Sequence, residues 1–143
     1  MPKKILFFAF CLLLLSCSND DDLRNNNPNL INQRVSLQLD LNLPQYNNLQ
    51  FPGNSFVTYN YGINGIVIFN VNNSVYTAFE MSDPNHPLTD CSTLKLNGTE
   101  VTCRCNDGNK YTIITGQQVA GVGQYSLKPY RIERRGTILE ISN

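Results

Sequence analysis

The sequence predicts an all-β domain built from small antiparallel sheets in a sandwich or barrel arrangement. Apolar residues alternate strictly from Val35 to Leu43 (VSLQLDLNL), which is the period of a strand with one buried face. Short β-branched and aromatic runs follow, and turn-forming pairs separate them. After residue 16 no segment of useful length has apolar residues at helical spacing, so no substantial helix is expected.

The remaining strands are expected in hairpins. GIVIFNV (65–71) and SVYTAF (74–79) flank Asn72-Asn73, a pair that tolerates the left-handed geometry of a tight turn. Three further turn pairs predict hairpins in the same way: Asn97-Gly98 between TLKL and TEVTC, Asp107-Gly108 between VTCRC and KYTII, and Arg135-Gly136 between PYRIE and TILEIS.

Residues 1–16 have the pattern of a lipoprotein signal peptide. Lys3 and Lys4 precede an apolar run from Ile5 to Leu15, which is too short for a membrane-spanning helix. Leu-Leu-Ser-Cys (14–17) resembles the lipobox of bacterial lipoproteins, in which the cysteine is acylated and becomes the new N-terminus. The resemblance implies lipidation of Cys17 and a stable anchor of several acyl chains. An ordinary signal peptide with a chance cysteine is the alternative.

Residues 17–33 are expected to form the lipidated Cys17 and a flexible tether, because they are polar, rich in asparagine and interrupted by Pro28. The run SNDDD (18–22) resembles the acidic surface-export signal of Bacteroidetes lipoproteins, and a solvated run of charge explains it equally well. We therefore expect an outer-membrane lipoprotein of the bacterial cell envelope, periplasmic or surface-exposed. Residues 34–143 are sufficient for one domain.

The charge balance argues against a nucleic-acid partner. Without residues 1–16 the chain has 9 basic and 11 acidic residues, a net charge of −2. Nucleic-acid binding needs a concentration of positive charge, which this composition lacks. The expected partner is the membrane, through the lipid anchor, and the sequence identifies no protein or small-molecule ligand.

Three segments follow one another in an order that resembles a known family: GIVIFN (65–70), VYTAFEMSDPNHP (75–87) and CSTLKLNGTEVTCRCNDGNKYTIITGQQ (91–118). In this order residues 34–143 resemble a Rieske domain, the all-β fold of Rieske proteins and ring-hydroxylating ferredoxins. LNLPQYNNLQFPG (41–53) is similar to the N-terminal stretch of Rieske-like lipoproteins from Bacteroidetes. The matching framework residues are Ala78-Phe79, Gly108, Tyr111, Thr115-Gly116, Gly121 and Leu127 to Tyr130.

The resemblance implies where a 2Fe-2S cluster would be held. The family uses Cys-x-His in one loop and Cys-x-x-His in a second loop. Here the first motif falls on Asp83-Pro-Asn85 and the second on Cys103-Arg-Cys-Asn106, so three of the four ligands are absent. His86 lies one residue late and could serve only if the loop shifted register. Because an asparagine amide is a poor iron ligand, no cluster is predicted.

The resemblance also implies a role for the other cysteines. In Rieske proteins with a Cys-x-Cys-His second loop, the middle cysteine forms a disulfide to the first loop, which corresponds here to Cys91 and Cys105. An oxidising compartment permits such a bond. Closing this loop would stabilise the fold by about 3 kcal/mol. Pairing of Cys91 with Cys103 is the alternative.

No catalytic residue is identified, and we expect a lipid-anchored, non-catalytic binding or structural module. One alternative is an electron-transfer protein whose 2Fe-2S cluster has atypical ligands drawn from His86, Cys91, Cys103 and Cys105. The same four residues could bind zinc, although Cys-x-Cys spacing is a weaker signal than paired Cys-x-x-Cys. A nucleophilic Cys103 served by His86 and Asp83 is a third possibility, supported only by their presence in the two loops.

Overall fold

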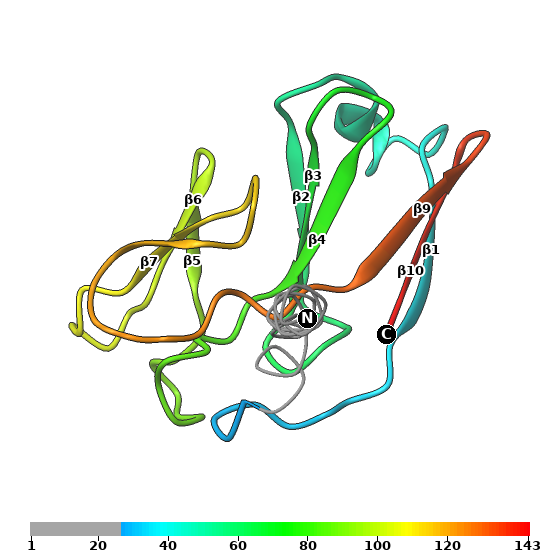
Figure 1. The fold of residues 1–143 in the computed structure, drawn as a ribbon. Coiled ribbons are helices and arrows are strands. Elements are labelled where there is room, and N and C mark those ends of the chain that lie inside the picture. Colours follow the sequence, from blue (N-terminus) through cyan, green and yellow to red (C-terminus); the bar gives the residue numbers. More distant parts are fainter. Residues whose placement is uncertain (1–26) are drawn as a thin grey trace, which may run out of the picture.

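The computed structural model describes residues 27–143, which form three antiparallel sheets (Figure 1). The all-β prediction is confirmed, because the described residues contain ten strands, no α-helix and one 3-10 turn, η1 (Asn47–Gln50). The strands are β1 (Ser36–Asp40), β2 (Ser55–Thr58), β3 (Ile66–Asn70), β4 (Tyr76–Glu80), β5 (Lys95–Asn97), β6 (Glu100–Thr102), β7 (Lys110–Thr112), β8 (Gln118–Ala120), β9 (Arg131–Arg135) and β10 (Ile138–Ser142).

The sheets have the strand orders β1-β10-β9, β2-β3-β4 and β5-β6-β7-β8. Figure 1 shows the β2-β3-β4 sheet between the other two. The first sheet pairs the two ends of the domain, with Leu39 of β1 opposite Leu139 of β10. Because its partners come from opposite ends of the chain, this sheet closes the domain.

The middle strand of the central sheet, β3, is buried on both faces. Ile66 and Ile68 of β3 pack into a core shared with β1 and β10, whereas Val67 and Phe69 pack into a second core shared with β6 and β7. A strand covered on both sides is apolar at every position. This explains why GIVIFNV reads as a continuous apolar run while β1 alternates.

Most of the predicted turns are present. Gly98 (φ 61°) closes the β5–β6 hairpin and Gly136 (φ 63°) closes the β9–β10 hairpin. Asn73 (φ 67°) supplies the left-handed residue between β3 and β4. Asp107-Gly108 differs from the prediction of a tight hairpin, because the whole segment 103–109 connects β6 to β7. Strands β2 and β8 were not predicted, since both are short and neither has a clear alternation.

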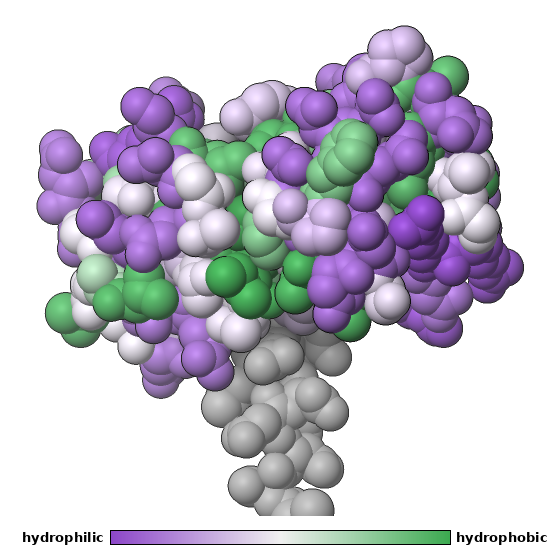
Figure 2. All heavy atoms as spheres, turned by 90° about the horizontal axis from the view of Figure 1, so that it is seen from above, coloured by the Kyte–Doolittle hydropathy of each residue, from purple (hydrophilic) through white to green (hydrophobic). Residues whose placement is uncertain are grey.

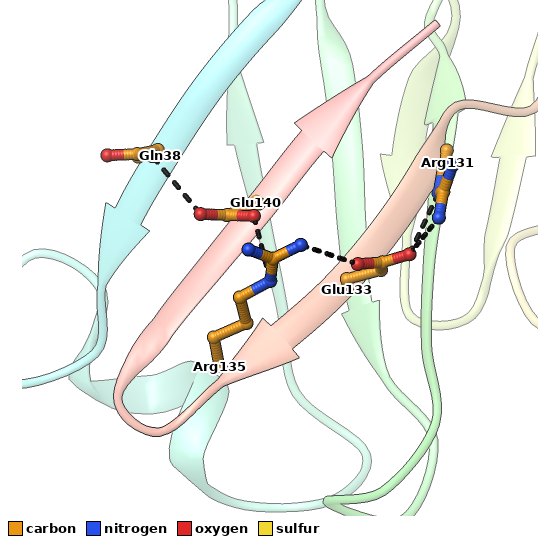
Figure 3. A network of polar contacts seen from close by, with 5 residues as sticks. All are labelled: Gln38, Arg131, Glu133, Arg135 and Glu140. Atoms are coloured by element: carbon orange, nitrogen blue, oxygen red, sulfur yellow. Dashed lines mark hydrogen bonds and ion pairs between the residues drawn. The ribbon is translucent and has the colours of Figure 1, made fainter.

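Charged side chains cover the outer face of the first sheet (Figure 3). Glu133 and Glu140 stand directly opposite each other, an arrangement that is unfavourable for like charges. Arg135 lies between them, 3.3 Å from Glu133 and 3.2 Å from Glu140, and Arg131 also pairs with Glu133. The two arginines hold the pKa of Glu133 below its usual range. In these exposed ion pairs the two positive charges of the arginines balance the two negative charges of the glutamates.

Residues 27–33 lie against the domain, although the sequence predicts a tether through residue 33. The side-chain amides of Asn27 and Asn29 donate to the carbonyl oxygen of Pro84 at 2.8 and 3.0 Å. Lys128 Nζ donates to the carbonyl oxygen of Ile31 at 3.2 Å. The asparagines that suggested a tether therefore provide hydrogen bonds to the first of the two loops.

No helix within residues 27–143 is long and apolar enough to cross a membrane. Figure 2 shows hydrophilic side chains around small, separate groups of hydrophobic ones on the face that it displays. The signal peptide predicted for residues 1–16 and the predicted lipidation site Cys17 lie outside the described residues.

Candidate functional site

Two loops meet beside the β5–β8 sheet: residues 81–94 between β4 and β5, and residues 103–109 between β6 and β7. The first loop is closed by a backbone hydrogen bond from Asp83 N to Ser92 O at 2.9 Å. The second is closed by a bond from Cys103 N to Asn109 O, also at 2.9 Å. Each loop therefore has its own backbone closure next to a position that the Rieske motif assigns to a ligand.

A disulfide between Cys91 and Cys105 joins the two loops, with the Cα atoms 5.0 Å apart. This is the pairing that the resemblance to Rieske domains implies. It leaves Cys103 as the one cysteine of the described residues outside a disulfide. The alternative pairing of Cys91 with Cys103 is not the one in the structure.

Asp83, at the position of the first cysteine ligand, is fully buried. Its Oδ1 accepts the Tyr111 hydroxyl at 2.5 Å and the backbone N–H of Asn85 at 2.9 Å. Its Oδ2 accepts the side-chain amide of Asn109 at 3.0 Å. Burying a carboxylate is costly unless donors replace its water, and three donors do so here.

Tyr111 remains a donor because of the same surroundings. Burial raises the pKa of Tyr111 above its ordinary value, and its hydrogen bond to Asp83 adds to the effect. The phenol therefore keeps its proton at neutral pH. The hydroxyl also accepts a hydrogen bond from the Asn85 amide at 2.9 Å.

Asn85, at the position of the first histidine ligand, binds a third segment, residues 121–125. Its Nδ2 donates to Tyr125 O at 2.7 Å, and its Oδ1 accepts the backbone N–H groups of Gln124 and Tyr125 at 3.0 and 2.9 Å. A Cβ on Gly123 would overlap the Asn85 amide, so only glycine allows this approach. The donors and acceptors of the amide are fully used.

Asn109 contacts the same segment at Gly121 and Val122. Its Oδ1 accepts the backbone N–H of Val122 and the side-chain amide of Gln118, both at 3.2 Å. Gly121, with φ 94°, has room only for a hydrogen atom against Asn109. The segment Gly121-Val122-Gly123 thus packs against both Asn85 and Asn109.

Cys103, the one cysteine at a position that the Rieske motif assigns to a ligand, is buried. Burial raises the pKa of its thiol to about 12, and the nearby carboxylates of Asp83 and Asp107 act in the same direction. The backbone N–H of Cys105 opposes them and is outweighed. A thiol with so high a pKa is a poor nucleophile at neutral pH.

The two remaining candidate residues, Asn106 and His86, are more exposed to solvent than Asp83 and Cys103. Asn106, at the position of the second histidine ligand, is exposed and has φ 61°. His86 is half-buried, with Nδ1 3.7 Å from Cys105 Sγ and 2.7 Å from Pro87 O. The structure therefore brings Asp83, Asn85 and Cys103 together, while Asn106 and His86 stand at the edge.

The sequence did not assign Tyr111 or Asn109 to the site. Tyr111 was identified only as a framework residue, and Asn109 carried no signal. Both face Asp83 because Tyr111 lies in β7 and Asn109 directly precedes it. Only the three-dimensional arrangement reveals this network.

A buried glutamate, also not predicted, positions the first loop. Glu80, at the end of β4, accepts the backbone N–H groups of Ile63 and Asn64 at 2.8 and 2.9 Å and the Tyr130 hydroxyl at 2.6 Å. Its Oε1 also accepts the Ser82 hydroxyl at 3.1 Å. The start of the loop is therefore anchored before Asp83 turns inward.

The residues at the four positions that the Rieske motif assigns to ligands do not fit a 2Fe-2S cluster. Such clusters need thiolates, with imidazoles on one iron in Rieske centres. Asp83 and Asn85 are already engaged by protein donors and acceptors. Asn106 offers only an amide, so Cys103 alone supplies a ligand sulfur. Within residues 27–143 no buried side-chain nitrogen or oxygen atom lacks a hydrogen-bond partner, so none awaits a ligand.

No family model matches this sequence, and no curated protein matches it either. The solved structures that are similar in shape include the following two. The first is a complex of reduced oxygenase and oxidised ferredoxin in carbazole 1,9a-dioxygenase, with 15% identity, 77% of this chain and 94% of the other covered, and a TM-score of 0.49. The second is a protein assigned as the small subunit of an NADPH nitrite reductase, with 17% identity, 73% and 97% covered, and a TM-score of 0.43. At these values neither similarity carries information on a cofactor, an activity or a partner of this chain.

Replacement of Asp83 tests the buried network. Asp83→Ala removes the acceptor of the Tyr111 hydroxyl and the Asn109 amide, and each unpartnered buried donor costs about 1–3 kcal/mol. We expect the free energy of unfolding, measured with urea, to fall by about 3 kcal/mol. The exposed Asp90→Ala serves as control and should change it by less than about 0.5 kcal/mol. Equal effects of the two variants would contradict the assignment.

The reactivity of Cys103 tests its protonation. With a pKa of about 12, alkylation in the folded chain should be slow at neutral pH and should keep accelerating well above pH 9, where an ordinary thiol levels off. The folded-state pKa lies above the unfolded one, so this group stabilises the fold below pH 9 and loses that contribution between pH 9 and 12. Mass spectrometry of the peptide containing Cys103 gives the rate. A rate equal to that in urea would contradict the prediction.

Proposed function

We propose that this chain is a Rieske-like domain without a cluster, serving as a non-catalytic binding or structural module of the bacterial cell envelope. The observation that carries the proposal is the hydrogen-bond network at Asp83, Asn85 and Tyr111. In a cluster protein the positions of Asp83 and Asn85 would offer lone pairs to iron. Here they offer them to the protein itself.

The network gives the two loops a structural role in place of a redox one. Asp83 ties the first loop to β7, and Asn85 ties it to the segment before Tyr125. The Cys91–Cys105 disulfide links the same loops covalently. Together these contacts hold three segments in one arrangement without a metal ion. A rigid cluster of loops is a suitable platform for binding.

Attachment to the outer membrane through lipidated Cys17 is part of the proposal. It is supported by the lipobox-like Leu-Leu-Ser-Cys (14–17) and by the short apolar run that precedes it. The hydrogen bonds of Asn27 and Asn29 to Pro84 O add a consequence. Asn27 and Asn29, which follow the proposed anchor and tether, contact the first loop, so this end of the domain would stay near the membrane.

Iron and sulfide analysis of the full chain, expressed and purified without oxygen, tests the absence of the cluster. We expect a colourless protein with no stoichiometric iron or acid-labile sulfide, because three of the four ligand positions lack a thiol or imidazole. A Rieske protein purified in parallel controls for cluster loss during handling. Two irons and two sulfides per chain would instead establish the electron-transfer alternative with atypical ligands.

Membrane fractionation of the wild-type chain and of Cys17→Ser tests the anchor. The wild-type chain should be found in the outer-membrane fraction and carry a lipid-sized mass increase on its N-terminal peptide. Cys17→Ser should lack that increase, because the hydroxyl is not acylated by this pathway. Cys11→Ser, inside the apolar run, is the matched control and should behave as wild type. An unmodified wild-type Cys17 would contradict the proposal.

A further inference from the structure

The disulfide that joins the loops lies within a group of metal-binding residues. The sulfurs of Cys91 and Cys105 and a ring nitrogen of His86 lie within 4.8 Å of one another. Two thiolates and an imidazole are a common zinc ligand set, and the corresponding distances between ligand atoms in a tetrahedral zinc site are about 3–4 Å. The three side chains are half-buried, so solvent reaches them and could bring a metal ion.

A hydroxyl group stands where it could support such a site. Thr89 Oγ1 lies 3.4 Å from Cys91 Sγ and 3.9 Å from Cys105 Sγ. A hydroxyl in this position can donate to a thiolate, and hydrogen bonds of this kind orient metal ligands and tune their basicity. Donation by this hydroxyl would favour the thiolate form of one of the two sulfurs.

The loops do not depend on the disulfide alone to stay together. Asp83 N donates to Ser92 O, next to Cys91, and Cys103 N donates to Asn109 O across the second loop. The side chain of Arg104 donates to Thr93 O at 2.9 Å, which links the two loops directly. After reduction these bonds would keep the two sulfurs close to each other.

We propose that reduction of the Cys91–Cys105 disulfide creates a Zn²⁺ site formed by Cys91, Cys105 and His86, with water as the fourth ligand. Zinc binding and the disulfide are then mutually exclusive states of one junction. Oxidation would release the metal, and reduction would allow it to bind. This site is separate from the former cluster positions and does not depend on the function proposed above.

The reaction balances with a dithiol as reductant. The dithiol transfers two electrons and two protons to the disulfide, giving two protein thiols and the oxidised form of the dithiol. Zinc then displaces one proton from each thiol, and the two thiolates neutralise its charge. His86 binds through Nδ1 as neutral imidazole with its proton on Nε2, and gives up the contact of Nδ1 with Pro87 O.

Zinc titration of the full chain, in detergent and in competition with a chromophoric chelator, tests the proposal. Cys11 and Cys17 are replaced by serine throughout, so that they cannot bind the metal. After reduction with a phosphine we expect one zinc per chain, and before reduction no stoichiometric zinc. Reduced His86→Gln should bind at least tenfold more weakly. Asp90→Asn, adjacent to Cys91, is the control and should bind as wild type.

Circular dichroism at each stage separates a folded site from metal binding by an unfolded chain. The reduced chain should either keep its β-sheet spectrum or regain it when one equivalent of zinc is added. Equal affinities of the oxidised and reduced chains would overturn the proposal. So would equal affinities of wild type and His86→Gln, or zinc bound to a reduced chain that stays unfolded.

Discussion

The hydrogen bond from the Tyr111 hydroxyl to the buried carboxylate of Asp83 ties the first loop to β7. A carboxylate at this depth is tolerated only if donors surround it, and this requirement fixes its neighbours. Asn109 must present its amide, and Tyr111 must keep its proton, which its raised pKa ensures. Because Asn85 bonds to the same hydroxyl, the segment before Tyr125 is drawn into the arrangement as well.

Packing of the three sheets positions the two loops that carry Asp83 and Asn109. β3 and β4 lie between two hydrophobic cores, so the first loop leaves a strand that cannot move without disturbing both. Glu80 then anchors the start of that loop through buried hydrogen bonds. The second loop connects β6 and β7, and the Cys91–Cys105 disulfide joins it to the first loop. Hydrophobic packing thus fixes the two pairs of strands, β3–β4 and β6–β7, whose loops carry the polar network.

The sequence predicted the parts of this structure that have a local signal. The alternating apolar residues around β1 reflect one buried face, and the turns at Asn73, Gly98 and Gly136 need left-handed backbone. The contacts of Asp83 with Asn109 and Tyr111 could not be predicted, because they join residues 26 and 28 positions apart with no repeating pattern. The ligand positions were recognisable only by comparison with a family motif. What replaces the ligands depends on packing between loops, which a one-dimensional pattern does not contain.

Restoring the missing ligands is the most direct test of the claim that a Rieske-like site has been replaced by a hydrogen-bond network. The variant combines Asp83→Cys, Asn85→His and Asn106→His and keeps Cys103, which recreates both family motifs. Histidine is among the residues that tolerate the left-handed backbone of Asn106 (φ 61°). The account predicts two irons and two sulfides per chain in the purified variant. A folded variant that keeps the Cys91–Cys105 disulfide and binds no iron would contradict it.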